Sequence, residues 1–322
     1  MKELNKFQKY FIEEFYDDYR EGLITRRTFF RRVAFITGSV SASIVAMTAV
    51  GCAPIELPAA DEPMPEPATP EPQAEALEPV PGAQSPLSVP ENDPDVQSAM
   101  VTLTSQGDEI SVYVARPAAE GTYPGVLVCH ENRGLTVHIR DVARRFAKAG
   151  YVALAPDLLA REGGTDSRDY DEIPGLLSNA DPDRHVADFQ AGFDYLAGLE
   201  SVYADRISMN GYCFGGGITW RSVTAIPGLA AAAPFYGPAP DLDAVSNIQA
   251  AMLGVYAEED ERINAGIEPL AEALDAVGVT YQMNVYPGVN HAFHNDTGER
   301  FVEETALEAW GDMLAWFEQH AG

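Results

Sequence analysis

The chain has 322 residues, enough for one sizeable folded domain beside other segments. Its formal net charge is −28, from 21 Lys and Arg against 49 Asp and Glu, which argues against nucleic acid or an anionic lipid surface as a partner because both would repel it. Three cysteines, at positions 52, 129 and 213, are too few for a disulfide scaffold.

The first 52 residues resemble an export leader. Residues 1–24 are polar, with aromatic residues at helical spacing. Arg26 and Arg27 precede a moderately apolar stretch at residues 33–50, a pattern typical of a twin-arginine signal. The alternative is a transmembrane anchor, for which a stretch so rich in Ala, Ser, Thr and Gly is marginal. The stretch ends in Thr48-Ala-Val-Gly-Cys52, which is similar to a lipoprotein lipobox. We therefore predict export, with Cys52 lipidated and the chain tethered to a membrane on its extracytoplasmic side.

Residues 53–95 are crowded with Pro, Glu and Ala. Such a composition buries too little apolar surface to fold, so we expect an extended, semi-rigid spacer. It suits a domain that is held away from a membrane.

The folded domain is predicted at residues 96–322, and its elements alternate. Residues 101–114 read as a β-hairpin that turns near positions 106–108. The expected strands that follow are 123–129, 151–155, 207–210, 229–236, 251–256 and 280–286. The expected helices are 137–149, 184–199, 218–225, 265–277 and 301–320, and residues 161–183 form a long loop or partly helical cap.

Strands that alternate with helices imply an α/β fold with a mostly parallel sheet and helices on both faces. The opening hairpin supplies an antiparallel edge. Ligand sites in such sheets lie at the carboxyl ends of the strands, where Glu131, Cys213, Asp260 and His291 all fall.

The stretch Gly211-Tyr-Cys-Phe-Gly215 has the spacing of a nucleophile elbow, G-x-[SC]-x-G, with cysteine as the central residue. Glycines two before and two after let the backbone pass closely at a strained strand-to-helix turn. The turn also places the amide of Phe214 at a helix N-terminus, where developing negative charge is stabilised. Cys129, in an apolar run, is expected to be a buried, inert thiol.

A thiol attacks acyl carbon as the thiolate, so Cys213 needs a base. His291 is the best candidate of six histidines because it lies in a loop after the strand that ends near residue 286. His130 precedes the nucleophile, and His294 is at best a substrate contact. An orienting carboxylate should follow the strand at 251–256, where residues 258–261 offer four acids. The order nucleophile, acid, histidine is that of α/β-hydrolases.

These motifs resemble the dienelactone hydrolase family, and the resemblance runs from about Val96 to the C-terminus. It is carried by His130-Glu131 at the end of a strand, by Gly211-Tyr-Cys-Phe-Gly-Gly216, and by Tyr286-Pro-Gly-Val-Asn-His-Ala-Phe293. It implies an α/β-hydrolase fold and a cysteine-dependent hydrolase of lactone or ester bonds, of the carboxymethylenebutenolidase type, that acts through a thioester.

The resemblance also implies roles for single residues. Cys213 is the nucleophile, His291 the general base and acid, and Asp260 its orienting partner. Glu131 matches a glutamate that helps to deprotonate the thiol. The oxyanion hole would be formed by the backbone amides of Asn132 and Phe214.

One departure concerns the substrate. Dienelactone hydrolases bind a substrate carboxylate with arginines, one of them shortly after the histidine, where this chain has Phe293-His-Asn-Asp296. Arg133, Arg161 and Arg168 are possible replacements, and the sequence selects none of them.

Two other functions compete with hydrolysis. One is a surface-tethered, non-catalytic module that binds a small molecule on a hydrolase fold. The other is metal binding by His291 and His294 with nearby acids, although two histidines make an incomplete ligand set. We expect no cofactor and no metal, and no protein partner is inferred; the expected ligand is a small ester or lactone.

Overall fold

The structure is a computed structural model, and it describes residues 4–38 and 77–322. Cys52 and positions 53–76 of the predicted spacer lie outside the described residues. Among the residues that are described, no helix is both long and apolar enough to span a bilayer.

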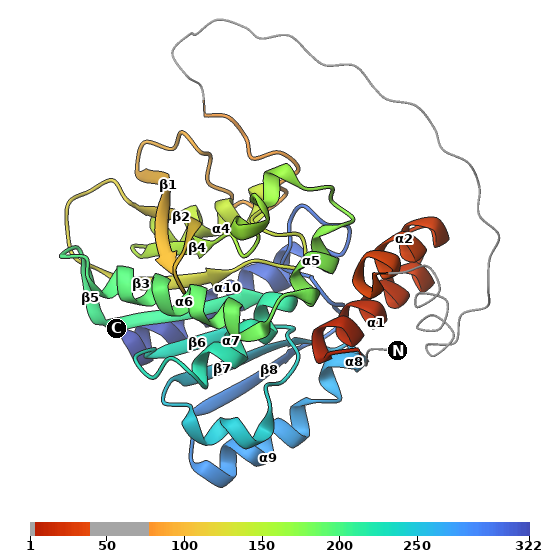
Figure 1. Ribbon diagram of the computed structural model, residues 1–322. Coiled ribbons are helices and arrows are strands. Elements are labelled where there is room, and N and C mark those ends of the chain that lie inside the picture. The colour runs from red at the N-terminus through yellow and green to blue at the C-terminus, as the bar shows by residue number, and fades with distance from the viewer. Residues whose placement is uncertain (1–3, 39–76) are drawn as a thin grey trace, which may run out of the picture.

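Eight strands form one sheet in the order β1-β2-β4-β3-β5-β6-β7-β8 (Figure 1). Their bounds are β1 (Val96–Ser105), β2 (Asp108–Pro117), β3 (Tyr123–Cys129), β4 (Val152–Pro156), β5 (Val202–Tyr212), β6 (Ala231–Phe235), β7 (Ala251–Ala257) and β8 (Tyr281–Tyr286). The β1–β2 and β2–β4 pairs are antiparallel and the other pairs are parallel. The predicted mostly parallel sheet with an antiparallel edge is therefore confirmed.

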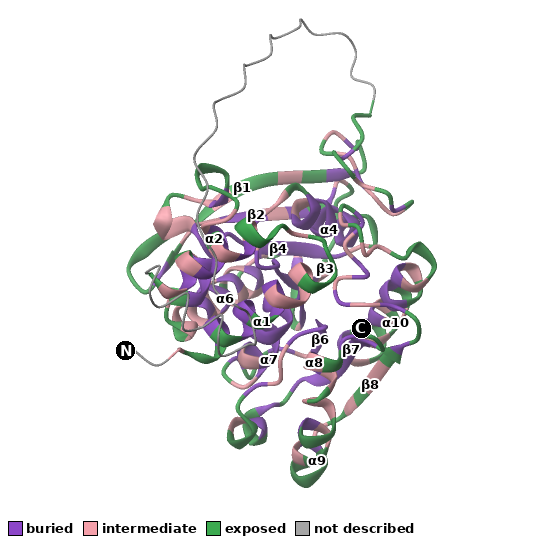
Figure 2. Ribbon diagram, turned by 90° about the vertical axis from the view of Figure 1, so that its right-hand side faces the viewer, coloured by how far each residue is buried: buried purple, intermediate pink, exposed green. Residues whose placement is uncertain are grey.

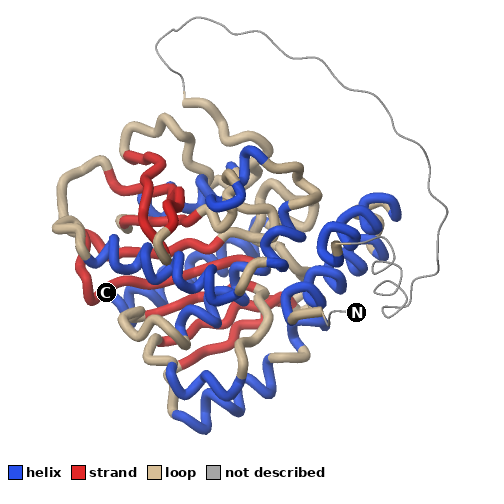
Figure 3. The backbone as a smooth tube through the Cα atoms, viewed as in Figure 1, coloured by secondary structure: helices blue, strands red, loops and turns tan. Residues whose placement is uncertain are grey.

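Helices cover both faces of the sheet (Figures 1 and 3). The longer ones in the domain are α4 (Val137–Lys148), α6 (Pro182–Ala197), α7 (Phe214–Val223), α9 (Ile267–Val277) and α10 (Glu303–Ala321), and the short ones are η1 (Ala160–Glu162), η2 (Thr165–Ser167), α5 (Ile173–Asn179), η3 (Leu242–Asn247) and α8 (Glu261–Asn264). On one face α4 meets α10, where the Phe146 and Trp310 ring centroids are 4.6 Å apart. On the other face α6 packs against α7. The central strands are buried, whereas β1 and α9 carry much exposed surface (Figure 2).

Two helices precede the domain and lie against it: α1 (Lys6–Arg20) and α2 (Arg26–Thr37). The two helices pack together through aromatic rings: the ring centroids of Tyr19 in α1 and Phe29 in α2 are 5.8 Å apart, and the ring planes are nearly parallel. On the domain side α2 contacts α5, where a Cβ on Gly175 would meet the backbone of Phe35. We call α1 and α2 the N-terminal hairpin.

The C-terminal part of the predicted spacer contacts the domain before Val96 is reached. Val80 and Val89 are buried, and the Val89 amide donates to Asp141 at 2.7 Å. The amide of Ser85 donates to the buried carboxylate of Asp296 at 3.0 Å. Backbone amides of the described part of the spacer are thus held by the buried carboxylates of Asp141 and Asp296, and the composition of the spacer gives no sign of this.

Two of the boundaries that differ from the sequence predictions lie at the elbow. Strand β5 begins at Val202 and not at residue 207, and α7 begins at Phe214 and not at residue 218. Gly215, Gly216 and Gly217, which precede the predicted helix, lie inside the first turn of α7. They are needed there because a Cβ on Gly215 would strike the carbonyl of His130, and one on Gly216 would strike that of Phe235.

Candidate active site

Cys213 lies at a sharp turn between β5 and α7. Its φ is +58° and its ψ is −120°, a left-handed conformation that costs a non-glycine residue energy. The turn is held by its neighbours, because the Cys213 amide donates to Phe235 O at 3.0 Å and the Gly216 amide donates to Cys213 O at 2.9 Å. Gly211 permits the turn, since a Cβ there would overlap the backbone of Gly215. This is the geometry that the elbow spacing predicts.

The backbone amides of Phe214 and Asn132 were predicted to form the oxyanion hole. Phe214 is the first residue of α7, so its amide has no acceptor within the helix. Burial raises the pKa of the Cys213 thiol, and the nearby Phe214 amide offsets part of that rise. Asn132 is buried just after β3, and both residues lie beside Cys213 in the fold.

His291 and Asp260 form the hydrogen-bonded pair that was predicted. The distance from His291 Nδ1 to Asp260 Oδ2 is 2.5 Å, and both side chains are buried. Burial alone would raise the pKa of Asp260, but the charge and hydrogen bond of His291 outweigh it and hold that pKa below its ordinary value. Asp260 also caps α8 by accepting from the Ile263 amide at 3.3 Å. The helix thereby fixes the carboxylate that orients the imidazole.

The imidazole and the thiol are close together. A ring nitrogen of His291, Cys213 Sγ and a carboxylate oxygen of Glu14 all lie within 4.8 Å of one another. His291 Nε2 is buried and makes no hydrogen bond to any described residue. Since Nδ1 is bonded to Asp260, Nε2 is the nitrogen left to exchange a proton.

Glu131 lies in the same cavity as Cys213, as the resemblance implied. Burial raises the pKa of its carboxyl, and Asn295 Nδ2 donates to it at 2.5 Å. Burial also raises the pKa of the Cys213 thiol, and the carboxylates of Glu14 and Glu131 raise it further. In this arrangement the sulfur is therefore held as the neutral thiol.

A cavity of about 300 Å³ opens at the sulfur. Its wall includes Cys213, Glu131, His291 and three arginines, Arg32, Arg133 and Arg300. This volume suits a small organic ligand.

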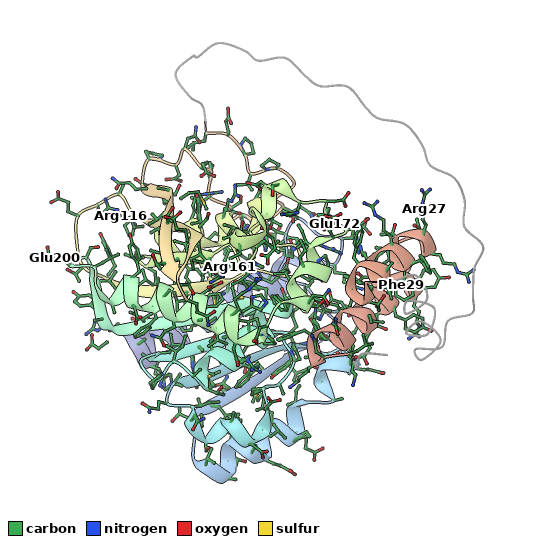
Figure 4. All side chains as sticks on the ribbon, in the orientation of Figure 1. Arg27, Phe29, Arg116, Arg161, Glu172 and Glu200 are labelled. Carbon is green, nitrogen blue, oxygen red and sulfur yellow. The ribbon has the colours of Figure 1, made fainter. Side chains whose placement is uncertain are left out.

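Of the three arginines that the sequence left open, only Arg133 lines this cavity. Arg161 binds Asp188 and Asp108 at 2.8 Å, and its place on the front of the domain is marked in Figure 4. Arg168 is exposed. The Arg133 guanidinium stacks 4.4 Å from the Tyr170 ring centroid, and no carboxylate of residues 4–38 or 77–322 lies within 4.0 Å of it.

Other histidines are structural. His294 is buried and stacks on Tyr212 with centroids 4.9 Å apart, so it lies in the core and is not part of the wall of the cavity at the sulfur. His130 is also buried, and its Nε2 accepts from the Leu158 amide at 3.3 Å. Within the described ranges, the one group of three potential metal ligands is Glu14, Cys213 and His291, and His294 is not part of it.

Sequence reasoning missed the contribution of the N-terminal hairpin. The Tyr10 hydroxyl lies 3.3 Å from Cys213 Sγ, and both carboxylate oxygens of Glu14 lie 3.5 Å from it. A signal was present: Phe7, Phe11 and Phe15 mark an apolar face, and Glu14 stands on that face. An acid in such a stripe needs a partner, although the sequence does not say which.

The sheet, the elbow turn and the paired His291 and Asp260 define an α/β-hydrolase. The family model for the dienelactone hydrolase family matches residues 110–321, and the chain belongs to that family. It is a hydrolase that acts on ester or lactone bonds.

Relatives share most of the domain. A protein of Salmonella typhi named for carboxymethylenebutenolidase activity is 35% identical over 256 residues, covering 74% of this chain and 93% of that protein. A protein of the same name from Escherichia coli K12 is 35% identical over 248 residues, covering 71% and 90%. A crystal structure named for a dienelactone hydrolase of Klebsiella pneumoniae has a TM-score of 0.65 at 33% identity, and covers 70% of this chain and 99% of that one.

Replacement of Asp260 tests the orienting pair. Asp260→Asn leaves the shape but removes the charge that fixes the His291 tautomer, so we expect kcat for a small activated ester to fall by about 100-fold or more. Glu259→Gln, an exposed neighbour in the same turn, is the matched control and should keep full activity. Equal kcat values for the two variants would show that Asp260 does not orient His291 during catalysis.

Proposed function

We propose that the chain hydrolyses lactone or ester bonds with Cys213 as nucleophile, through a thioester intermediate. The supporting observation is the strained turn that holds Cys213 Sγ within 4.8 Å of a His291 nitrogen, with Asp260 hydrogen-bonded to Nδ1 of the same imidazole. His291 takes the thiol proton, the thiolate attacks the acyl carbon, and the amides of Phe214 and Asn132 stabilise the oxyanion.

The leaving oxygen takes its proton from His291, which completes acylation. In a lactone this step opens the ring, so the new hydroxyl stays on the acyl group. Water then attacks the thioester, His291 accepts its proton, and the carboxylic acid leaves as the thiol re-forms. Glu131, buried beside the sulfur, is the additional base proposed to help when substrate arrives.

Arg133, one of the three arginines in the cavity wall, favours an anionic substrate. Arg133 is half-buried, and partial burial lowers its pKa from the ordinary value. A guanidinium with no bound carboxylate beside a nucleophile matches a ligand carboxylate in charge and geometry. Arg133 is therefore the residue proposed to bind a substrate carboxylate.

The leader is proposed to direct export, with Cys52 as the lipid-modified residue that holds the chain at a membrane. Arg26 and Arg27, the basis of this proposal, are exposed on α2, and Arg27 is labelled in Figure 4. Accessible arginines are what a receptor-read signal requires.

Replacing the sulfur tests the nucleophile. Cys213→Ala should lower kcat/KM for p-nitrophenyl acetate by about 1,000-fold or more, because no covalent route remains. Cys129→Ala removes the other described thiol and should retain turnover. Acid quenching during turnover should trap an acyl adduct on Cys213, detected by peptide mass spectrometry. Tight binding of lactones without turnover by the wild type would instead support the non-catalytic binding module.

Arg133→Gln tests carboxylate recognition. We expect KM for a carboxylate-bearing lactone to rise about 10- to 100-fold, since a charged hydrogen bond is lost. KM for a neutral ester should not change, and Arg168→Gln serves as the control on an exposed arginine. An equal loss on both substrates would show that Arg133 only supports the fold.

Cell fractionation tests the leader. The double variant Arg26→Lys, Arg27→Lys should remain in the cytoplasm, whereas Arg20→Lys should be exported like the wild type. Cys52→Ala should be exported but found outside the membrane fraction. Normal export of the double lysine variant would refute the twin-arginine assignment.

A further inference from the structure

We propose that the N-terminal hairpin is an intramolecular inhibitor of this hydrolase, and that Glu14 is the inhibitory group, bound where the carboxylate of a product would lie. The proposal rests on Cys213 being the nucleophile, and the experiment below separates the two. It gives residues 4–38 a role that the family resemblance does not cover, because the family model begins at residue 110.

The residues on the buried face of α1 indicate what kind of surface the helix covers. Its buried face is formed by Phe7, Tyr10, Phe11, Glu14 and Phe15, which repeat at the spacing of one helical face. A carboxylate inside an apolar face is costly to bury unless hydrogen bonds and charges compensate it. The compensating groups therefore have to come from the surface that this face covers.

That surface is the active site. Asn132 Nδ2 donates to the Glu14 carboxylate, and both oxygens of that carboxylate are 3.5 Å from Cys213 Sγ. The carboxyl carbon thus lies beside the sulfur, where the carbon of a newly released acid would lie. The Tyr10 hydroxyl contacts the same sulfur at 3.3 Å.

Occupation of this position blocks the reaction. An acyl carbon has to reach the sulfur from the cavity, and the carboxylate of Glu14 stands at that point. Cys213 is only 3% exposed with the hairpin in place. The negative charge of Glu14 also opposes formation of the thiolate, since like charges disfavour each other at short distance.

Apolar contacts hold α1 on the catalytic turn. The ring centroid of Phe7 is 5.1 Å from that of Phe214, and that of Phe11 is 5.4 Å from it. Phe214 is the residue that follows the nucleophile. The hairpin therefore packs directly on the elbow, so its docking determines whether the sulfur is covered.

Polar contacts hold the hairpin at its periphery. Arg300 of the domain lies 2.9 Å from Asp18 and 2.7 Å from Glu21. Asp18 belongs to α1, and Glu21 directly follows this helix. On the other side Arg31 binds Asp169 and Arg32 binds Asp171, at 2.7 and 2.8 Å. These contacts come from segments on both sides of the cavity, so the hairpin spans its mouth. Covalent attachment keeps the local concentration of the inhibitor high.

The test compares full-length variants that all carry Cys52→Ser, so that Cys213 is the accessible thiol to be followed. Glu14→Ala removes the inhibitory carboxylate. Glu13→Ala is the matched control, because Glu13 is the adjacent, exposed glutamate of the same helix. The double variant Asp169→Ala, Asp171→Ala weakens docking from the domain side without substituting any residue of α1 or of the cavity wall.

Two quantities are measured: kcat/KM for p-nitrophenyl acetate, and the rate of Cys213 alkylation by iodoacetamide, followed by peptide mass spectrometry. We expect Glu14→Ala and the double aspartate variant to raise both by at least about tenfold, and Glu13→Ala to raise neither. Alkylation requires no turnover and therefore reports on the accessibility and ionisation of Cys213 independently of catalysis.

The outcomes are distinct. Faster alkylation of both test variants with no ester hydrolysis by any variant would support the docked hairpin and refute the proposed function. Unchanged alkylation in both test variants would overturn the inference. So would a loss of activity in Glu14→Ala with unchanged alkylation, because Glu14 would then serve catalysis.

Discussion

The active-site arrangement depends on one strained residue, Cys213, whose positive φ is maintained by the elements around it. The turn is possible only where Gly211 and Gly215 leave room for adjoining backbones, and it is tied to β6 through Phe235. Because β3, β5, β7 and β8 run parallel, their carboxyl ends bring the later loops to the same edge of the sheet. The same turn that raises the sulfur also starts α7 and aims its first amide at the sulfur.

Charge is the second constraint at this edge. Three carboxylates, from Glu14, Glu131 and Asp260, surround one thiol and one imidazole. Asp260 is compensated by His291, and Glu131 by Asn295. Glu14 receives a hydrogen bond from Asn132, but it also lies against the sulfur, which has to become negative in order to react. A site with Glu14 in place therefore stabilises the thiol form, and an open site stabilises the thiolate better.

Local pattern was sufficient for the strands and for the elbow, because each depends on periodicity or on glycine spacing, and the order of nucleophile, acid and histidine followed from where the loops fall; the choice of Asp260 came from the family resemblance. It was insufficient for the choice among four acids at 258–261, which depends on Asp260 capping a one-turn helix that sequence reasoning did not predict. It was also insufficient for the hairpin. An amphipathic face shows that a partner surface exists, but which surface is covered depends on contacts more than 100 residues away, such as that of Tyr10 with Cys213 at a separation of 203 residues.

The two roles argued for the leader are physically compatible. Docking uses the face of α1 that carries Phe7, Phe11 and Glu14, whereas the proposed export signal is Arg26 and Arg27, which are exposed on α2. Arg31 and Arg32, whose ion pairs hold α2 to the domain, are separate from Arg26 and Arg27. Because the two proposed roles use different surfaces of the hairpin, binding of Arg26 and Arg27 does not require Glu14 to leave Cys213.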